Sequence, residues 1–333
     1  SINGAHIIST KADGMIAVGA MDHEIVSSDL ARIEEVATLG KVPANREILE
    51  VVPHSYRLDG QDNIKDPLGM TGTRLEINAN VVSALSPHLH NLEKSASMAK
   101  VEPHLITPAV LAASRAVLAE QQKENGVAVI DLGGATTSIA IFEEGDLQWV
   151  SVIPVGGVNI TNDLAIGLKT DPEIAEKVKV GHAVVFGRKN DERISLKQDK
   201  EQFYFDAHEV DEIAEARLDE IFEAIQKELK KAGKAGQLPS GVILTGGTSK
   251  IKGMAEYAKD KLGLAVRVGK AGGFGGVIEG IEDPQFATAI GLMLLDAEGA
   301  GEKPSTHRSG ENSKAALKKA GGFLSSFLNR FKA

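Results

Sequence analysis

The sequence of 333 residues contains no cysteine, which excludes disulfide bonds, thiolate zinc sites and cysteine nucleophiles. It also lacks long apolar runs: the longest, such as Ala289 to Leu295, fall far short of the roughly 20 residues that span a bilayer. We therefore expect neither a transmembrane helix nor a signal peptide. An excess of basic residues is missing too, because the net charge is −9. We expect no nucleic-acid partner, since phosphate contacts require a basic face.

Hydrophobic residues make up 42% of the chain. That is enough for one large core or two to three smaller ones, so we expect a globular, multidomain protein. The first 78 residues contain four strand-like stretches around one helical stretch, Ser28 to Thr38, which predicts a compact α+β unit. The strand-like stretches are Ala5–Ser9, Met15–Val18, Glu47–Pro53 and Arg74–Ile77.

Beyond residue 78, strand patterns alternate with helix patterns, which indicates a parallel sheet. A strand from Ala79 onward opens this region, and Val127–Ile130 and Ser138–Phe142 are predicted to form a hairpin with a glycine-rich tip. The other expected helices are Leu92–Ala99, Ala109–Gln122, Asn162–Leu168, Pro172–Val180, Asp211–Lys231 and Gln285–Leu295. The other expected strands are His104–Pro108, a buried Gly241–Thr245 and a polar strand-bearing segment at Phe186–Tyr204.

Three turns with paired glycines follow strand ends and are candidate phosphate-binding elements. A triphosphate needs several converging backbone N–H groups, and glycine permits that close approach. In the first turn, Asp131-Leu132-Gly133-Gly134-Ala135-Thr136-Thr137, the carboxylate can hold Mg²⁺ through water and both threonine hydroxyls are expected to face the phosphates. The others are Pro154-Val155-Gly156-Gly157, before a helix that starts near Thr161, and Thr245-Gly246-Gly247-Thr248. An ordinary hairpin turn would also favour Asp and Gly.

Glu176 and Lys179 lie three residues apart on an expected helix, and therefore on one face. In that position they are candidates for holding a ribose hydroxyl and an adenine edge. A solvated salt bridge has the same spacing, so the sequence leaves both interpretations open.

The order of these turns resembles the ATPase fold of actin, the large heat-shock chaperones and sugar kinases, over roughly Ala79 to Leu295. A narrower resemblance is to the FtsA family of bacterial cell-division proteins. It rests on the run Ile64-Lys65-Asp66-Pro67-Leu68-Gly69-Met70-Thr71-Gly72-Thr73-Arg74-Leu75-Glu76 and on Gly126–Phe142, Ile153–Asp163 and Gly241–Gly253. The resemblance implies an α/β, actin-like (ribonuclease H-like) two-lobed ATPase fold, with an inserted α+β subdomain and a C-terminal amphipathic helix.

The same resemblance implies that the protein binds ATP and Mg²⁺. The implied nucleotide contacts are Asp131, which also holds the metal through water, Gly133, Gly134, Thr136, Thr137, Gly156, Gly157, Glu176, Lys179, Gly246 and Gly247. Two positions depart from the family pattern, because Ala135 replaces a usual third glycine and Ser138 a frequent acidic residue. The family's first phosphate loop would precede Ser1, so we expect this chain to bind ATP weakly or not at all. No residue that would position an attacking water is identifiable, and hydrolysis is left open.

The resemblance also divides the chain into subdomains. Residues 1–78 are the inserted unit, and residues 79–125 complete the first lobe. Residues 126–180 and 240–295 form the second lobe, and residues 181–239 are its small subdomain. The Gly-, Glu-, Ser- and Pro-rich stretch 296–313 is expected to be a disordered linker. Residues 314–333 form the amphipathic helix.

The C-terminal helix has an apolar face about 140° wide, at about 100° per residue, and a basic opposite side. This pattern is typical of a helix at an anionic membrane surface. The expected membrane residues are Phe323, Leu324, Phe327, Leu328, Arg330 and Phe331. Docking onto a protein surface would require the same pattern.

The resemblance to the FtsA family implies an adaptor that self-associates and anchors FtsZ filaments to the cytoplasmic face of the membrane at the division site. By family resemblance, the FtsZ C-terminal tail would bind the small subdomain near Arg217, Lys230 and Lys231, and other division proteins would bind residues 1–78. Alternatives on the same fold are an actin-like pilus-assembly protein, a sugar- or acetate-kinase-type phosphotransferase and a heat-shock chaperone. His88 and His90 are expected in a solvated loop without a metal.

Overall fold

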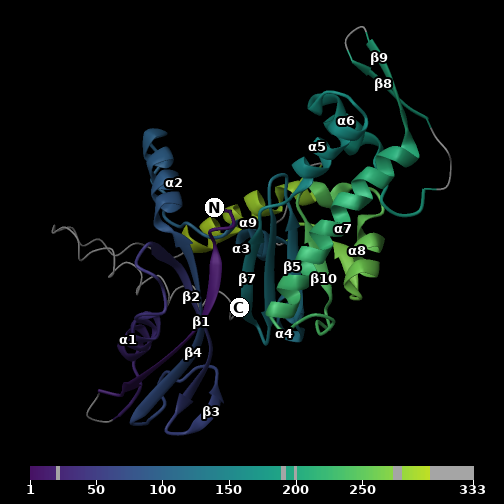
Figure 1. The fold of residues 1–333 in the computed structure, drawn as a ribbon. Helices are drawn as coiled ribbons and strands as arrows, with labels where there is room; N and C mark the ends of the chain where they lie inside the picture. Colours follow the sequence, from purple (N-terminus) through teal and green to yellow (C-terminus); the bar gives the residue numbers. More distant parts are fainter. Residues whose placement is uncertain (20–22, 189–192, 199–200, 273–279, 301–333) are drawn as a thin grey trace.

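The computed structural model describes residues 1–19, 23–188, 193–198, 201–272 and 280–300 (Figure 1). Nine strands form one long sheet in the order β11-β10-β5-β6-β7-β1-β4-β2-β3, and β8 and β9 form a separate pair. The inserted unit occupies the end of the sheet with β1 to β4, and the second lobe occupies the other end (Figure 1). The candidate site lies at the second-lobe end.

The inserted unit is an antiparallel sheet packed against one helix. Its elements are β1 (Ile8–Ala17), α1 (Ser27–Thr38), β2 (Arg46–Leu58), β3 (Gln61–Ile64) and β4 (Arg74–Leu85). In α1, Ile33 and Ala37 are one helical turn apart and are both buried against the sheet. Gly14 permits this packing, because a Cβ there would lie 2.9 Å from the Ala37 backbone. The prediction of separate strands at 5–9 and 15–18 was wrong, since β1 is one continuous strand, and β3 was missed.

Three helices follow the inserted unit: α2 (Ser86–Met98), α3 (Ala109–Val117) and α4 (Glu120–Asn125). The helix predicted at 92–99 therefore starts six residues earlier, with a proline in its first turn. The helix predicted at 109–122 is interrupted, because Leu118 has extended dihedrals and ends α3. No strand forms at 104–108, where only Pro108 makes an isolated bridge. The two histidines predicted in a loop lie on α2, and His88 stacks on His6 with ring centroids 4.0 Å apart.

The second lobe is built on β5 (Val127–Leu132), β6 (Thr137–Glu143), β7 (Asp146–Ile153), β10 (Val242–Thr245) and β11 (Val266–Val268). β10 runs parallel to β5 and β11, whereas β5, β6 and β7 are antiparallel neighbours. β5 is apolar except for Asp131 and its other residues are buried, as expected for a central strand covered on both faces. β7 and β11 were not predicted.

Helices cover both faces of this part of the sheet (Figure 1). They are α5 (Gly157–Gly167), α6 (Pro172–His182), α7 (Ala207–Lys231), α8 (Met254–Leu262) and α9 (Ala287–Ala300), with short 3₁₀ turns η1 (Gly247–Lys250) and η2 (Pro284–Phe286). The strand pair β8 (Arg193–Gln198) and β9 (Glu201–Asp206) extends outward beside α6, which confirms the strand-bearing segment (Figure 1). α8 was missed.

The predicted linker starts later than expected, because α9 continues through residues 296–300. The remaining linker and all six predicted membrane residues, from Phe323 to Phe331, lie outside the described residues. Within the part of the chain that the structure describes, no helix has the length and apolarity to cross a membrane.

The contact between α3 and α9 depends on a glycine. A Cβ at Gly291 would lie 1.7 Å from the carbonyl oxygen of Ala112, so the two helix backbones meet without a side chain between them. We expect Gly291→Ala to lower the free energy of unfolding by about 1–3 kcal/mol, because the helices must separate. Urea unfolding followed by circular dichroism measures this. Gly181→Ala is the matched control, since nothing lies within 4 Å of its Cβ position in α6, and equal stability of the two variants would contradict the packing.

Candidate functional site

The first two glycine turns are joined by backbone hydrogen bonds. The tip of the β5–β6 hairpin is closed by Gly133 N–H, which donates to the Thr136 carbonyl at 3.0 Å. Two amides at the start of α5 donate back to this tip: Gly157 N–H to the Gly133 carbonyl at 2.9 Å and Val158 N–H to the Gly134 carbonyl at 2.8 Å. A Cβ at Gly156 would lie 2.6 Å from the Gly134 oxygen. The two turns therefore fit together only without side chains at their contact.

The third turn closes the same cluster from β10. The Thr248 hydroxyl donates to the Gly133 carbonyl at 2.9 Å. Gly246 has φ +84°, and a Cβ there would lie 2.3 Å from a carboxylate oxygen of Asp131. Three turns that are far apart in the sequence thus meet at one point beside the end of β5.

A helix N-terminus also opens at this point. α5 begins at Gly157, not near Thr161 as the sequence predicted, because the side chain of Asn159 accepts a hydrogen bond from Gly156 N–H at 3.0 Å and caps the first turn. The N–H groups of Gly156, Gly157 and Val158 already donate within the cluster, so the helix dipole is what makes this terminus favourable for a phosphate. The glycine pair is thus both a turn and a helix start.

Asp131 is the last polar residue of the buried strand β5. It lies opposite Ser138 of β6 and Thr245 of β10, and the Thr288 hydroxyl approaches its carboxylate at 3.5 Å. Burial raises the pKa of Asp131, and the contact with Thr288 opposes that shift. A nearby cation would favour the ionised carboxylate. In the described ranges no group of three or more His, Cys, Asp or Glu side chains is placed to hold a metal ion.

The two threonines of the first turn have different surroundings. Thr137 is fully buried and its hydroxyl donates to the Val155 carbonyl at 2.9 Å. The expectation that this hydroxyl faces the phosphates was therefore wrong, because it holds the second turn in place. The Thr136 hydroxyl accepts a hydrogen bond from the Asn3 amide at 3.0 Å, and Ser138 donates to the Asn3 oxygen at 3.0 Å. Sequence reasoning missed Asn3, whose only signal was the Asn-Gly pair.

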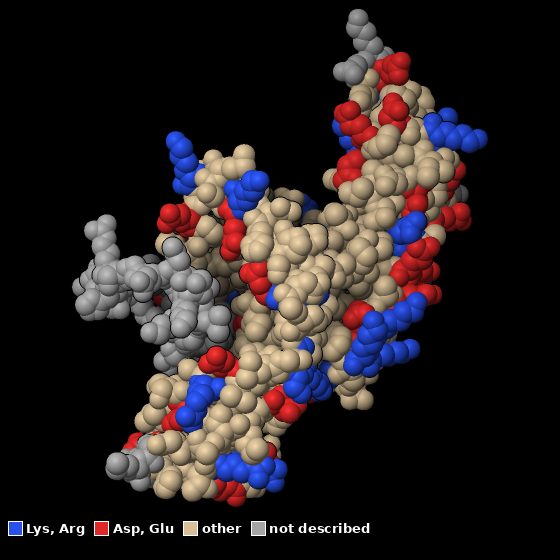
Figure 2. Space-filling model, turned by 60° about the vertical axis from the view of Figure 1, so that its left-hand side comes forward, with Lys and Arg blue, Asp and Glu red and all other residues tan. Residues whose placement is uncertain are grey.

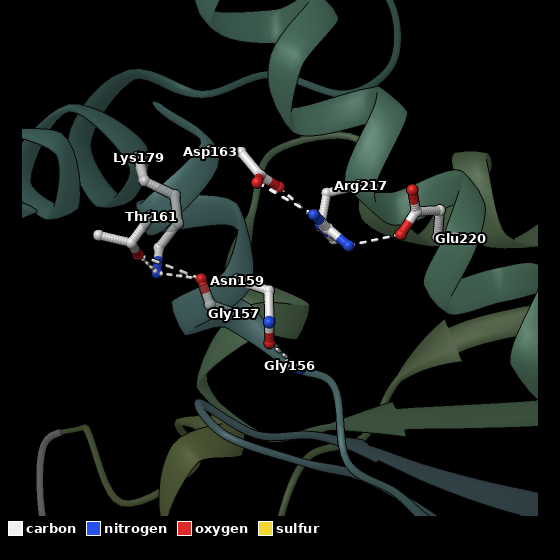
Figure 3. Close-up of polar contacts among 8 residues, drawn as sticks. All are labelled: Gly156, Gly157, Asn159, Thr161, Asp163, Lys179, Arg217 and Glu220. Atoms are coloured by element: carbon white, nitrogen blue, oxygen red, sulfur yellow. Dashed lines mark hydrogen bonds and ion pairs between the residues drawn. The ribbon is translucent and has the colours of Figure 1, made fainter. Parts of the chain in front are cut away.

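Glu176 and Lys179 lie on α6 and contact each other, with 2.6 Å between their charged atoms. The Lys179 side chain is only 7% exposed. Its ammonium group also donates to the Gly157 carbonyl at 2.9 Å and to the Thr161 hydroxyl at 2.8 Å (Figure 3). Burial raises the pKa of Glu176, but hydrogen bonds from Lys179 and Thr161 outweigh it and the net pKa is lowered. The pair is therefore attached to the second glycine turn through the buried Lys179, while the Glu176 side chain is 47% exposed.

A polar cavity of about 350 Å³ opens between the end of α6 and η1. Val180 and His182 line it from α6, and Lys250, at the end of the third turn, lines it from η1. Arg188, Arg193 and Lys252 complete a basic rim. The cavity thus borders two elements that were expected to contact adenosine.

The three residues expected to bind a partner do not form one patch. Arg217 faces α5, where it donates to both carboxylate oxygens of Asp163 at 2.6 and 3.0 Å and also pairs with Glu220 (Figure 3). Lys231 pairs with Glu228 at 2.6 Å, and Lys230 is exposed. Thirteen residues of helix separate Arg217 from Lys230, or about 20 Å. Basic and acidic side chains are also interspersed on the face shown in Figure 2.

Comparison with known proteins connects this arrangement to one family. A family model described as "Cell division protein FtsA" matches residues 128–291, and one described as "SHS2 domain inserted in FTSA" matches residues 4–83. The cell-division protein FtsA of Bacillus subtilis is 37% identical, over 90% of this chain and 68% of its own. That of Pseudomonas aeruginosa is 32% identical, over 93% and 75%.

The fold has solved neighbours as well. A crystal structure of MreB5 of Spiroplasma citri bound to ADP superposes with a TM-score of 0.54 at 18% identity, over 64% of this chain and 66% of that one. At this identity the likeness concerns the actin-like fold alone. The two family matches and the FtsA relatives go further, and show that this chain belongs to the FtsA family of actin-like bacterial cell-division proteins.

Proposed function

We propose that this chain is an adaptor that binds ATP with Mg²⁺, self-associates, and anchors FtsZ filaments to the cytoplasmic face of the cell membrane at the division site. The observation that carries the nucleotide part is the meeting of three glycine turns at the end of β5. Family membership supports a role in division. The membrane and FtsZ contacts rest on the charge and amphipathic patterns of the sequence.

The nucleotide would lie across the three turns. Its phosphates would lie against the backbone at Gly133, Gly134, Gly156 and Gly157, where glycine permits close approach and the dipole of α5 favours negative charge. The N–H groups of Gly133, Gly156 and Gly157 already donate within the cluster. Asp131 would hold Mg²⁺ through water. The adenosine would lie beside Gly246 and Gly247, toward the cavity that Lys250 lines from the end of η1. Lys179 and Glu176 would fix the position of the second turn. The Thr136 hydroxyl accepts a hydrogen bond from Asn3, so its own O–H could still donate to a phosphate.

Asp131 provides the test of the nucleotide site. We expect a labelled ATP analogue, titrated up to millimolar concentration, to bind weakly and only with Mg²⁺. Asp131→Asn should lower the affinity about tenfold and abolish most of the Mg²⁺ dependence, because an outer ligand of the metal is lost. Fluorescence anisotropy measures both effects. Asp62→Asn, an exposed residue of β3 in the inserted unit, is the control. Binding with the same affinity and Mg²⁺ dependence in both variants would exclude Asp131 from the site.

Membrane attachment would come from the basic, amphipathic C-terminal segment. Fully burying one large apolar side chain gives roughly 1.5–3 kcal/mol, but an interfacial helix inserts shallowly and must offset its own folding entropy. One tail therefore binds marginally. Tails displayed together on an assembly of copies would bind much more firmly, because each later contact becomes intramolecular.

Liposome co-sedimentation with anionic lipids tests the tail. The shortened chain should end at Ala300 so that α9 and the ion pair between Arg115 and Glu298 stay intact. We expect truncation to abolish sedimentation with liposomes, and Phe327→Glu to weaken it about tenfold or more by removing one buried aromatic. Ser326→Glu adds the same charge off the apolar face and is the matched control. Unchanged binding after truncation would assign the tail to protein docking.

The FtsZ C-terminal tail, treated as an acidic peptide, would bind along α7. Lys230 and Lys231 lie at the C-terminus of α7. The exposed carbonyl groups there carry partial negative charge and repel the acidic groups of the peptide. The peptide must therefore obtain its attraction from the lysine charges. Arg217 contributes less directly, because Asp163 already holds its guanidinium group.

Charge reversal separates these contributions. We expect Lys230→Glu combined with Lys231→Glu to weaken binding of an FtsZ tail peptide and to reduce its salt dependence, because two attractive charges become repulsive. Lys227→Glu, exposed on the same helix, is the control. Arg217→Asp with Asp163→Arg keeps an ion pair between α5 and α7 while removing the cation from α7. If isothermal titration gives the parent affinity for all of these variants, the peptide binds elsewhere.

A further inference from the structure

The inserted unit has an open sheet edge. On one side β1 pairs with β4 along its whole length, from Ile8 with Ser83 to Ala17 with Arg74. On the other side it makes a single bridge, Ile8 with Ser151 of β7. Within the ranges that the structure describes, no strand pairs with the outer edge from Thr10 to Ala17. Such an edge presents unpaired backbone groups to another strand.

The ladder tells which backbone groups point outward. Val18 N–H donates to the Thr73 carbonyl at 2.9 Å, and the groups that face a partner strand alternate along an antiparallel ladder. The backbone N–H and C=O groups of even-numbered residues in β1 therefore point toward β4, and those of odd-numbered residues point outward. The outward carbonyl of Ala17 accordingly accepts a hydrogen bond from Arg32. Lys11 and Asp13 thus offer free backbone groups at the middle of the open stretch.

The side chains of these two residues are exposed as well. Lys11 and Asp13 lie on the face of β1 opposite Ala12 and Ile16, which are buried. Asp13 has a side chain 76% exposed and contacts Lys41 at 2.9 Å in a surface ion pair. Such an exposed ion pair contributes little to stability, so Asp13 can readily exchange Lys41 for another cation.

Charge complementarity selects the partner strand. If a second copy of β1 runs antiparallel with Ala12 opposite Ala12, then Lys11 of each copy lies opposite Asp13 of the other. This register gives two pairs of opposite charge. Shifting the register to the neighbouring positions with the same hydrogen-bond pattern places Lys11 opposite Lys11 or Asp13 opposite Asp13, which is destabilising. An unrelated strand would need to supply this alternation, whereas a second copy has it already.

We propose that the outer edge of β1 is a self-association surface on which two copies of this chain pair antiparallel about a two-fold axis at Ala12. The inference names one contact for the self-association proposed above and is independent of the nucleotide and membrane parts. Thr10 pairs with Gly14 of the second copy, and the pairing ends before Ile8, where β1 pairs with β7. The contact is short and favours assembly where copies are already concentrated.

The absence of native cysteine permits a direct test by crosslinking. In the proposed register Lys11→Cys and Asp13→Cys face each other at about 5.5 Å between Cα atoms, within disulfide range. An equimolar mixture of the two full-length variants, one carrying a mass tag, should form the mixed disulfide in large excess over either self-disulfide. A statistical mixture, or no crosslink, would overturn the proposal.

A charge swap gives a second measurement. Lys11→Asp and Asp13→Lys should each weaken self-association about tenfold in sedimentation velocity, since two attractive pairs become like-charge pairs. The double variant restores both attractions and should regain the parent association. It still lacks the native contact of Asp13 with Lys41, so its recovery cannot come from that contact. Association that is equal in all variants would refute this surface and leave self-association through another face; an unrestored double variant would also refute it.

Discussion

The carbonyl group of Gly133 is the point on which the candidate site depends. It accepts one hydrogen bond from the amide of Gly157 and one from the hydroxyl of Thr248, both at 2.9 Å. Because both lone pairs are used, the hairpin tip, the start of α5 and the turn after β10 are fixed relative to one another. Side chains are excluded from the contact, so glycine at positions 156 and 246 is a steric requirement. The same requirement made these turns visible in the sequence.

The sequence was informative where a residue type has one dominant use. Paired glycines after apolar strands predicted the turns, and the charge-bearing amphipathic pattern predicted α7 nearly to its ends. Prediction from the sequence failed where tertiary contacts determine the structure or the role of a residue. The sequence predicted that Thr137 contacts phosphate, but its hydroxyl donates a hydrogen bond to the Val155 carbonyl. β7 and β11 were missed because their exposed or partly buried residues interrupt the apolar pattern. Asn3 was missed because a partner 133 residues away gives it its role.

The inserted unit meets the second lobe through a shared apolar core, to which Val82 and Ala84 of β4 and Leu147 of β7 belong, and through several polar contacts. The Asn80 amide donates to the Leu147 carbonyl at 2.9 Å, Lys65 pairs with Asp146 at 2.7 Å, and Asn3 contacts Thr136. Lys65 belongs to the run Ile64 to Glu76, on which the family resemblance rests. Gly69 and Met70 of this run form backbone hydrogen bonds with Ile25. The phosphate turn and the inserted unit are therefore linked directly, through Asn3 at one end of β6 and Lys65 beyond the other.

This link has a consequence for assembly. A phosphate at the first turn would accept from the Thr136 O–H while Asn3 still donates to the Thr136 oxygen, so the two hydrogen bonds would strengthen each other and the attachment of the inserted unit. By reciprocity, whatever holds the unit in place changes the affinity for the nucleotide by the same factor. A contact between copies at β1 would act on the unit that Asn3 precedes by only a few residues. Weak pairing at β1, marginal insertion of each tail and the coupling through Asn3 would then reinforce one another, because each raises the local concentration or order that the next one needs.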